Sequence, residues 1–173
     1  MSYRIFKGRM LFIGMLLTFT FSGHFLLAQK EFHEIQYKHV SFELPGVWSI
    51  KKKQDKGGDY SIVCKRDTMQ RFAVYCVNDE VNLKNLLFKH TGLLKAGENM
   101  AYMSIDEEEN VKFNHREAIT IGVHNQYLTD FYKGAFFAFH EQGRTFVVFW
   151  FTKETQQNVE ALRKTLESLK IKR

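Results

Sequence analysis

Cysteine is scarce in this chain, which has only Cys64 and Cys76 among its 173 residues. Neither lies near the N-terminus, so a lipid attached to a cysteine beside an export signal is excluded. The two cysteines fall on neighbouring predicted strands, and an antiparallel hairpin brings their sulfurs together only if residue 70 is the centre of pairing. A turn over residues 67–70 would separate them, so a structural disulfide and two buried thiols both stay open.

The sequence also lacks the common motifs of catalysis and nucleotide binding. It has no G-x-S-x-G elbow, and Gly57-Gly58 is not followed by the helix and Lys-Ser/Thr step of a phosphate loop. Cys64 lies within a strand among apolar residues, where a thiol is usually inert. We therefore predict no catalytic residue and no cofactor, although carboxylates that are distant in the sequence could still converge in the fold.

No metal-binding pattern is present among the histidines and acidic residues. No two histidines have the i, i+4 spacing of a helix or the i, i+2 spacing of a strand that would place them together. His90 falls in the apolar stripe of a predicted helix, where a core or border histidine is expected. The acidic run DEEEN at residues 106–110 lacks the interleaved glycine and carbonyl donors of a calcium loop, so we predict a solvated turn there.

The N-terminus, in contrast, carries the pattern of a secretory signal. Three basic residues are followed by the apolar run Met10–Phe21, then by Ser22 and Gly23, and Ala28 supplies the small residue of a cleavage site. We predict cleavage after Ala28 and export to the periplasm or the extracellular medium. The alternative is a retained anchor, since residues 10–28 almost reach the roughly 20 residues of a membrane-spanning helix.

Removal of this segment lowers the charge of the protein. The whole chain has 25 basic and 19 acidic residues, a net charge of +6, and residues 1–28 contain three of the basic residues and none of the acidic ones. The mature chain therefore carries about +3, and its one basic cluster, Lys51 to Lys53 with Lys56, is expected at a solvated strand end. This charge does not predict nucleic-acid binding. We divide the chain into a signal peptide (1–28), a short linker (29–36) and a single domain (37–173).

Hydrophobic periodicity predicts an α+β fold for this domain. Leucines from Leu83 to Leu94 follow helical spacing, with Asn82 or Asp79 available as the N-cap and Gly97 as the end. A second helix is predicted between a start at Thr152 and Leu169, and residues 168–171 could return as a short edge strand. The remaining segments read as strands, over residues 38–43, 47–52, 59–65, 71–77, 100–105, 116–124, 127–133, 135–141 and 145–151.

The last predicted hairpin, residues 135–151, is apolar on both of its faces. Phe137 and Phe139 point to one face and Phe136 to the other, and the following strand alternates in the same way. A strand that is apolar on both faces has to be covered on both. We therefore expect a central antiparallel sheet flanked by the two helices, an α/β/α sandwich.

Aromatic side chains of this hairpin are the candidates for a binding pocket. Phe136, Phe139, Phe149 and Trp150 could line an apolar cleft under a helix, because small-molecule sites are commonly lined by aromatic residues. The alternative is that they simply pack the core.

Two short segments resemble the PsbP-like family, which groups photosystem II extrinsic proteins, a yeast Ran-binding protein and many exported bacterial proteins. The segment SFELPGVWSI contains Phe42, Pro45 and Trp48 with the Pro-Trp spacing of that family, and LRKTLESLKIK at residues 162–172 matches its closing helix and strand, with Leu169 in place of Phe. The three residues of the first segment are expected to form a corner whose tryptophan fills the core. The resemblance implies an α/β/α sandwich and transfers no catalytic residue.

Taken together, these observations predict an exported, non-enzymatic binding or accessory protein of the cell envelope. Its partner would be another envelope protein or a small apolar ligand, with no nucleic acid and no stable membrane insertion once the signal is removed. The alternative is an exported enzyme whose site is assembled from residues far apart in the sequence.

Overall fold

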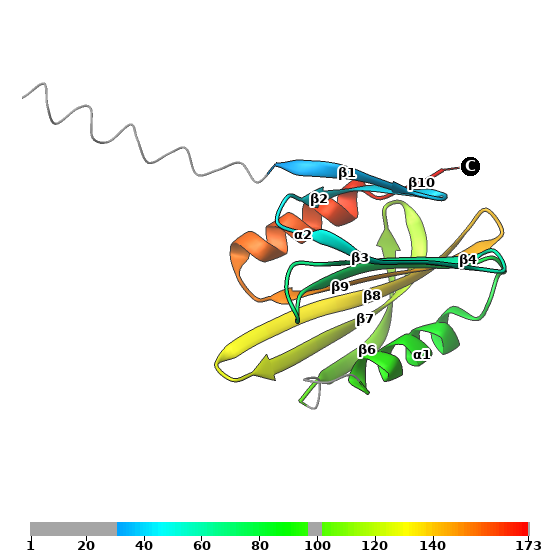
Figure 1. Ribbon diagram of the computed structural model, residues 1–173. Helices are drawn as coiled ribbons and strands as arrows, with labels where there is room; N and C mark the ends of the chain where they lie inside the picture. The colour runs from blue at the N-terminus through cyan, green and yellow to red at the C-terminus, as the bar shows by residue number, and fades with distance from the viewer. Residues whose placement is uncertain (1–30, 97–101, 173) are drawn as a thin grey trace, which may run out of the picture. The chain divides into compact units, whose positions relative to one another are not determined.

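The computed structural model describes residues 31–96 and 102–172. The predicted signal peptide, its cleavage site after Ala28 and the predicted helix end at Gly97 lie outside these residues. The described part is dominated by antiparallel strands with two helices (Figure 1). None of its helices is long and apolar enough to cross a membrane.

The larger of two sheets has seven antiparallel strands. Their order across the sheet is β3 (Ser49–Lys56), β4 (Asp59–Lys65), β5 (Arg71–Val77), β9 (Arg144–Lys153), β8 (Asp130–Glu141), β7 (Arg116–Tyr127) and β6 (Ser104–Phe113). Several neighbours are joined by tight turns. The clearest is Gln142-Gly143, where both residues have positive φ (54° and 71°), as a two-residue hairpin loop requires. The sequence predicts this turn correctly.

A smaller sheet contains three strands, in the order β1 (Phe32–Tyr37), β2 (Val40–Pro45) and β10 (Lys170–Ile171). Residues 32–36, predicted as a linker, belong to β1 and pair with β2, and their one deeply buried side chain is Ile35. The linker prediction is wrong here because Phe32 and Ile35 are three residues apart and do not show the alternation of a strand. The edge strand predicted at residues 168–171 is shorter in the structure: residues 170–171 form β10, whereas Ser168 ends the preceding helix.

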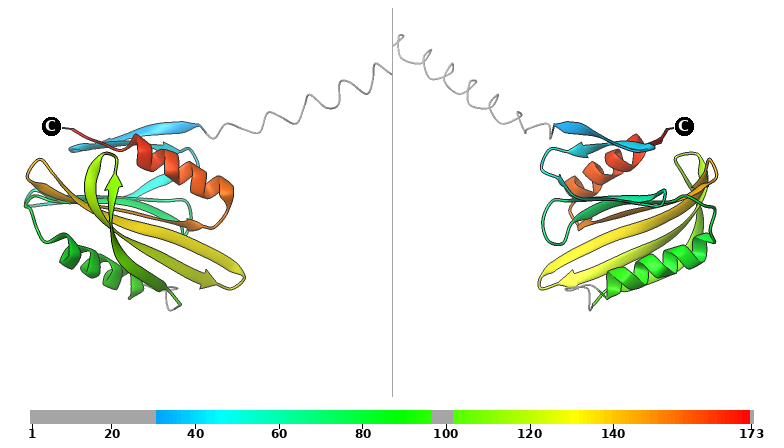
Figure 2. Two further views of the ribbon diagram at one scale, coloured as in Figure 1. Left: turned by 180° about the vertical axis from the view of Figure 1, so that it is seen from behind. Right: turned by 45° about the vertical axis from the view of Figure 1, so that its right-hand side comes forward.

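The two helices lie on opposite faces of the seven-stranded sheet (Figures 1 and 2). Helix α1 (Leu83–Lys95) contacts β7 and β8 on one face, whereas α2 (Gln156–Ser168) contacts β9 and β2 on the other. Each helix begins at a side-chain cap: the Oδ1 atom of Asn82 accepts a hydrogen bond from the backbone N–H of Asn85 (2.9 Å), and Thr155 caps α2. The predicted start at Thr152 is too early, because Thr152 is the buried penultimate residue of β9.

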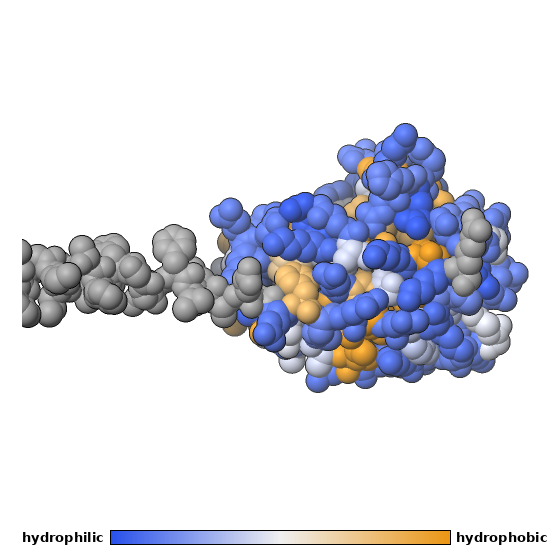
Figure 3. Space-filling view, turned by 90° about the horizontal axis from the view of Figure 1, so that it is seen from above, coloured by the Kyte–Doolittle hydropathy of each residue, from blue (hydrophilic) through white to orange (hydrophobic). Residues whose placement is uncertain are grey.

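Alternation along the central strands divides the buried side chains into two cores. Phe139, Phe146 and Val148 pack toward α2 and the smaller sheet. Phe136, Val147 and Phe149 pack toward α1. Both faces of the sheet are therefore apolar and a helix packs on each, as the two-faced hairpin requires. The outer face of the α2 layer is mostly hydrophilic (Figure 3).

Two predicted details are wrong. The acidic run at residues 106–110 is not a turn but the middle of the edge strand β6, where Glu108 pairs with Lys84 and a register shift follows Ile105. Charged side chains are tolerated there because an edge strand has one open side. The predicted strands 127–133 and 135–141 are one strand, β8, and the turn before it is at Leu128, whose φ is +57°. Leucine is rare at positive φ, so no turn signal marks this position.

Phe42, Pro45 and Trp48 lie at the passage from β2 in the smaller sheet to β3 in the larger one. The backbone N–H of Trp48 donates to the carbonyl oxygen of Pro45 (2.8 Å), which closes a turn. The Trp48 side chain is 5% exposed and Phe42 is 1% exposed, both within the α2-side core. The corner therefore turns the chain between sheets and fills the space between them.

We expect Trp48→Ala to lower the free energy of unfolding by about 3 to 5 kcal/mol, since it removes a large buried side chain without replacing its volume. Urea denaturation of the purified domain measures this loss. Val47→Ala is the matched control, because Val47 is adjacent and 50% exposed. Equal stability of the two variants would show that Trp48 does not support the core.

Candidate functional site

The four aromatic residues predicted to line one pocket are divided between the two faces of the sheet. Phe136 and Phe149 lie on the α1 side. Phe139 is buried in the other core, and Trp150 packs against that core. The four side chains therefore do not meet, and Phe136 and Phe149 border a common cavity.

Cys64 and Cys76 point to the same face but stand apart along their strands. Cys64 is opposite Phe72 and Cys76 is opposite Tyr60, a displacement of four residues. At roughly 3.3 Å per residue this is about 13 Å, well beyond the reach of a disulfide. Both are buried free thiols, and burial raises the pKa of Cys64 to about 12. Neither thiol is activated for chemistry.

A cavity of about 180 Å³ opens beside α1, above strands β4 and β5. We call it the α1 cleft. Its lining consists of Val63, Arg71, Ala73, Tyr75, His90, Leu93, Leu94, Phe136 and Phe149. The cleft exists because α1 lies over β7 and β8 and leaves the neighbouring strands without a helix. Sequence-distant residues from four strands and one helix therefore surround a single space.

Aromatic rings form much of the wall of this cleft. Phe136 and Phe149 are stacked with ring centroids 4.2 Å apart. The His90 ring extends from α1 over Tyr75, with ring centroids 4.5 Å apart, and its centroid lies 6.5 Å from that of Phe136. Leu93, which is 64% exposed, stands at the rim. Such a surface favours an apolar or aromatic guest.

The polar groups of the cleft are two neutral rings and one cation. Burial lowers the pKa of His90 to about 4 and raises the pKa of Tyr75, so both are uncharged at pH 7. Arg71 carries the only charge in the lining, and its Nε atom is buried without a hydrogen-bond partner among the described residues. The lining contains no carboxylate, thiol or serine, and this composition suits binding more than covalent catalysis.

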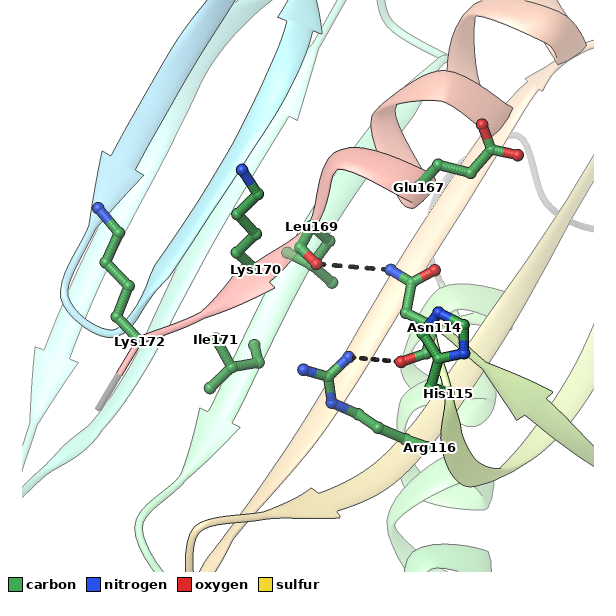
Figure 4. A pocket seen from close by; sticks show the side chains of 8 residues that line it. All are labelled: Asn114, His115, Arg116, Glu167, Leu169, Lys170, Ile171 and Lys172. Atoms are coloured by element: carbon green, nitrogen blue, oxygen red, sulfur yellow. Dashed lines mark hydrogen bonds between the residues drawn. The ribbon is translucent and has the colours of Figure 1, made fainter.

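A second and larger hollow, of about 510 Å³, lies between the β6–β7 turn and the end of α2. Its charged groups do not converge. The Nε atom of Arg116 donates to Glu141 (2.8 Å) and another guanidinium nitrogen donates to the Asn114 carbonyl oxygen (3.0 Å). Lys170 and Lys172 extend away from Arg116 (Figure 4). Asn114 also donates to the Leu166 carbonyl oxygen (2.7 Å), so these residues hold the hairpin against α2.

The described residues contain no group of three or more His, Cys, Asp or Glu side chains that could hold a metal ion. The closest histidine and carboxylate pair is His124 with Asp106 (3.0 Å), and it is half exposed. A single pair does not supply the ligands that a tightly bound metal requires.

Sequence reasoning located part of the α1 cleft. It identifies Phe136 and Phe149 as pocket candidates, and it places His90 within the apolar stripe of the helix, as a core or border residue. It missed Arg71 and Tyr75, because only the β4–β5 and β5–β9 registers bring these residues beside the phenylalanines. Alternation along β5 puts them on the face of Ala73 and opposite to Phe72, and this signal could have indicated them.

Comparison with known proteins identifies the fold. No family model and no curated protein sequence matches the chain. Among solved structures, cyanobacterial PsbP (CyanoP) from Synechocystis sp. PCC 6803 superposes with a TM-score of 0.53 at 10% identity, over 84% of this chain and 95% of that protein. The fold is therefore PsbP-like, which confirms the resemblance predicted from the segments around Phe42, Pro45 and Trp48.

Two further structures resemble the chain less closely. The Saccharomyces cerevisiae Ran-binding protein Mog1p gives a TM-score of 0.48 at 10% identity, over 82% of this chain and 96% of that protein. A Bacteroides thetaiotaomicron protein gives 0.46 at 12% identity over 78% of this chain. This chain spans only 46% of the length of the Bacteroides protein.

The lowered pKa of His90 predicts a pH dependence of stability. An unfolded histidine has a pKa near 6.5, so between pH 6.5 and pH 4 the unfolded state binds more protons than the folded state. The stability due to neutral His90 is therefore full above pH 6.5 and is lost as the pH falls through this window. We expect a loss on the order of 2 kcal/mol, allowing for the partial exposure of the ring.

His90→Gln, which does not titrate, isolates this effect from that of the carboxylates. Urea denaturation of both proteins at several pH values between 4 and 7.5 should show the wild type losing stability more steeply than the variant. Parallel pH profiles would mean that His90 titrates normally in the folded protein.

Proposed function

We propose that this protein is an exported, non-enzymatic binding module of the cell envelope, an α/β/α sandwich that holds a small apolar group in the α1 cleft. The observation that carries this proposal is the cleft itself, with its stacked Phe136 and Phe149, its uncharged His90 and Tyr75, and its accessible rim at Leu93. An apolar guest in this space would gain burial without displacing any packed side chain.

Export is supported by the N-terminal pattern. Basic residues, the apolar run Met10–Phe21 and the small residue Ala28 occur in the order that secretion requires. Because both cysteines are free thiols, the stability of the exported protein would depend on its two hydrophobic cores and not on a disulfide bond.

Binding is favoured over the enzyme alternative by the chemistry of the lining. The pKa shifts of His90 and Tyr75 both arise from burial and both favour the uncharged forms. A histidine with a pKa near 4 is a weak base at neutral pH, and no nucleophile or carboxylate stands beside it in the cleft.

An envelope protein is the second candidate partner, and the β7–β8 turn favours it. Leu128 is 80% exposed and adopts φ of +57°, and Phe131 nearby is 57% exposed. Exposed apolar side chains on a turn are common at docking surfaces, and a leucine in the left-handed region costs conformational energy.

Protein isolated from its native host should begin near Gln29, as signal cleavage after Ala28 requires. Mass spectrometry of the intact protein from the periplasmic or secreted fraction measures the mass directly. An intact Met1 on protein recovered without membranes would contradict export.

A neutral one-ring compound should bind in the α1 cleft. We expect titration with benzyl alcohol to shift backbone amide NMR signals of β5 and α1, with saturation in the millimolar range typical of so small a ligand. Val63→Trp, which fills the cleft from β4, should abolish these shifts. Val47→Trp adds the same ring at an exposed corner position and should leave them unchanged. Equal shifts in both variants would place the binding elsewhere.

A further inference from the structure

We propose that the natural guest of the α1 cleft is a small aromatic carboxylate, whose ring lies against Phe136 and Phe149 and whose carboxylate pairs with Arg71. This inference rests on the proposed binding function and names the class of its ligand. It depends on a group of cations at one end of the cleft that the fold itself leaves unpaired.

The first observation is a like-charge pair. Lys65 and Arg71 are directly opposite each other in the β4–β5 register, so their side chains share the face of the sheet that carries the cleft. Both are half buried. Burial lowers the pKa of Lys65, and the positive charges of Arg71 and Lys51 lower it further, so the three cations are close enough to repel one another. Like charges in opposite positions of a strand pair oppose folding.

The second observation is that no carboxylate offsets this charge within the described residues. Their ion pairs involve other cations, including Lys38, Lys84, Lys112, Arg116, Lys133, Lys153 and Arg163. Lys51, Lys65 and Arg71 form none. An anion bound at this end of the cleft would supply the missing charge.

The third observation concerns the guanidinium of Arg71. Its Nε atom is buried and has no hydrogen-bond partner among the described residues, although Arg71 lines the cleft. A buried donor without a partner is unfavourable, and a guanidinium matches a carboxylate through two parallel hydrogen bonds. Arg116 on the other face shows the contrast, since it is bonded to both Glu141 and Asn114.

The volume of the cavity limits the size of the apolar part of the ligand. At about 180 Å³ it is close to the roughly 150 Å³ that accommodates a single benzene ring in an engineered cavity of another protein. Nucleotides and long acyl chains are too large. Neutral His90 and Tyr75 add no charge, so the net charge of the lining comes from Arg71 and favours an anion.

Benzoate and benzyl alcohol, which share a ring and differ in charge, test this inference. In wild-type protein we expect benzoate to bind about tenfold more tightly than benzyl alcohol, and the difference to shrink in high salt. Arg71→Gln should lower the ratio of the two affinities from about ten to about one, and Lys65→Gln should lower it several-fold. Arg66→Gln is the matched control, because Arg66 makes its hydrogen bond to Asn158 of α2, outside the cleft.

The outcomes separate the two proposals. Equal affinity of wild-type protein for benzoate and benzyl alcohol overturns the carboxylate inference and leaves the binding function standing. Failure of both compounds to bind overturns the binding function and this inference with it. If Arg71→Gln does not fold, the comparison of the two compounds in wild-type protein and in Lys65→Gln still tests the carboxylate inference. Loss of the benzoate preference in Arg66→Gln would show that the preference arises from the net charge of the protein and not from the cleft.

Discussion

Strand β9 has apolar side chains on both of its faces, and both faces have to be shielded from water. Phe146 and Val148 point to one side, and Val147, Phe149 and Phe151 to the other, all of them almost fully buried. Its neighbours β5 and β8 repeat the pattern. The sheet therefore needs a layer on each face. Helix α1 packs on one face, and α2 with the three-stranded sheet packs on the other.

The two layers differ in width, and this difference produces the cleft. A helix is about 10 Å across and strands are about 4.8 Å apart, so a single helix covers roughly two strands of a sheet. On its face α1 covers β7 and β8, whereas the opposite layer adds strands β1 and β2 to its helix. The apolar floor formed by Ala73 and Phe149 therefore reaches beyond the edge of α1. The α1 cleft is a direct consequence of covering a seven-stranded sheet with one helix.

How far the sequence predicts this arrangement depends on whether a feature is local. Alternation along residues 135–151, the cap at Asn82 and the Gln142-Gly143 turn are local signals, and each is found in the structure. The pairing of one strand with another, in contrast, depends on residues that are distant in the sequence. Nothing in residues 32–36 indicates that they pair with β2, and the acidic run 106–110 is a strand only because β7 lies beside it. The separation of Cys64 from Cys76 is likewise fixed by register, which tolerates only one alignment of the apolar faces.

The same limit applies to the candidate site. Phe136 and Phe149 are visible in the sequence as aromatic residues, but Lys65 and Arg71 look like ordinary surface cations until the β4–β5 register places them together. Arg116, by contrast, is also half buried, but its guanidinium donates to Glu141 and to the carbonyl oxygen of Asn114. A fold selected only for stability would separate or neutralise Lys65 and Arg71, since their repulsion and the unsatisfied Nε atom both favour unfolding. Local features that oppose stability concentrate at functional sites, and here they border a cavity whose wall contains the stacked rings of Phe136 and Phe149.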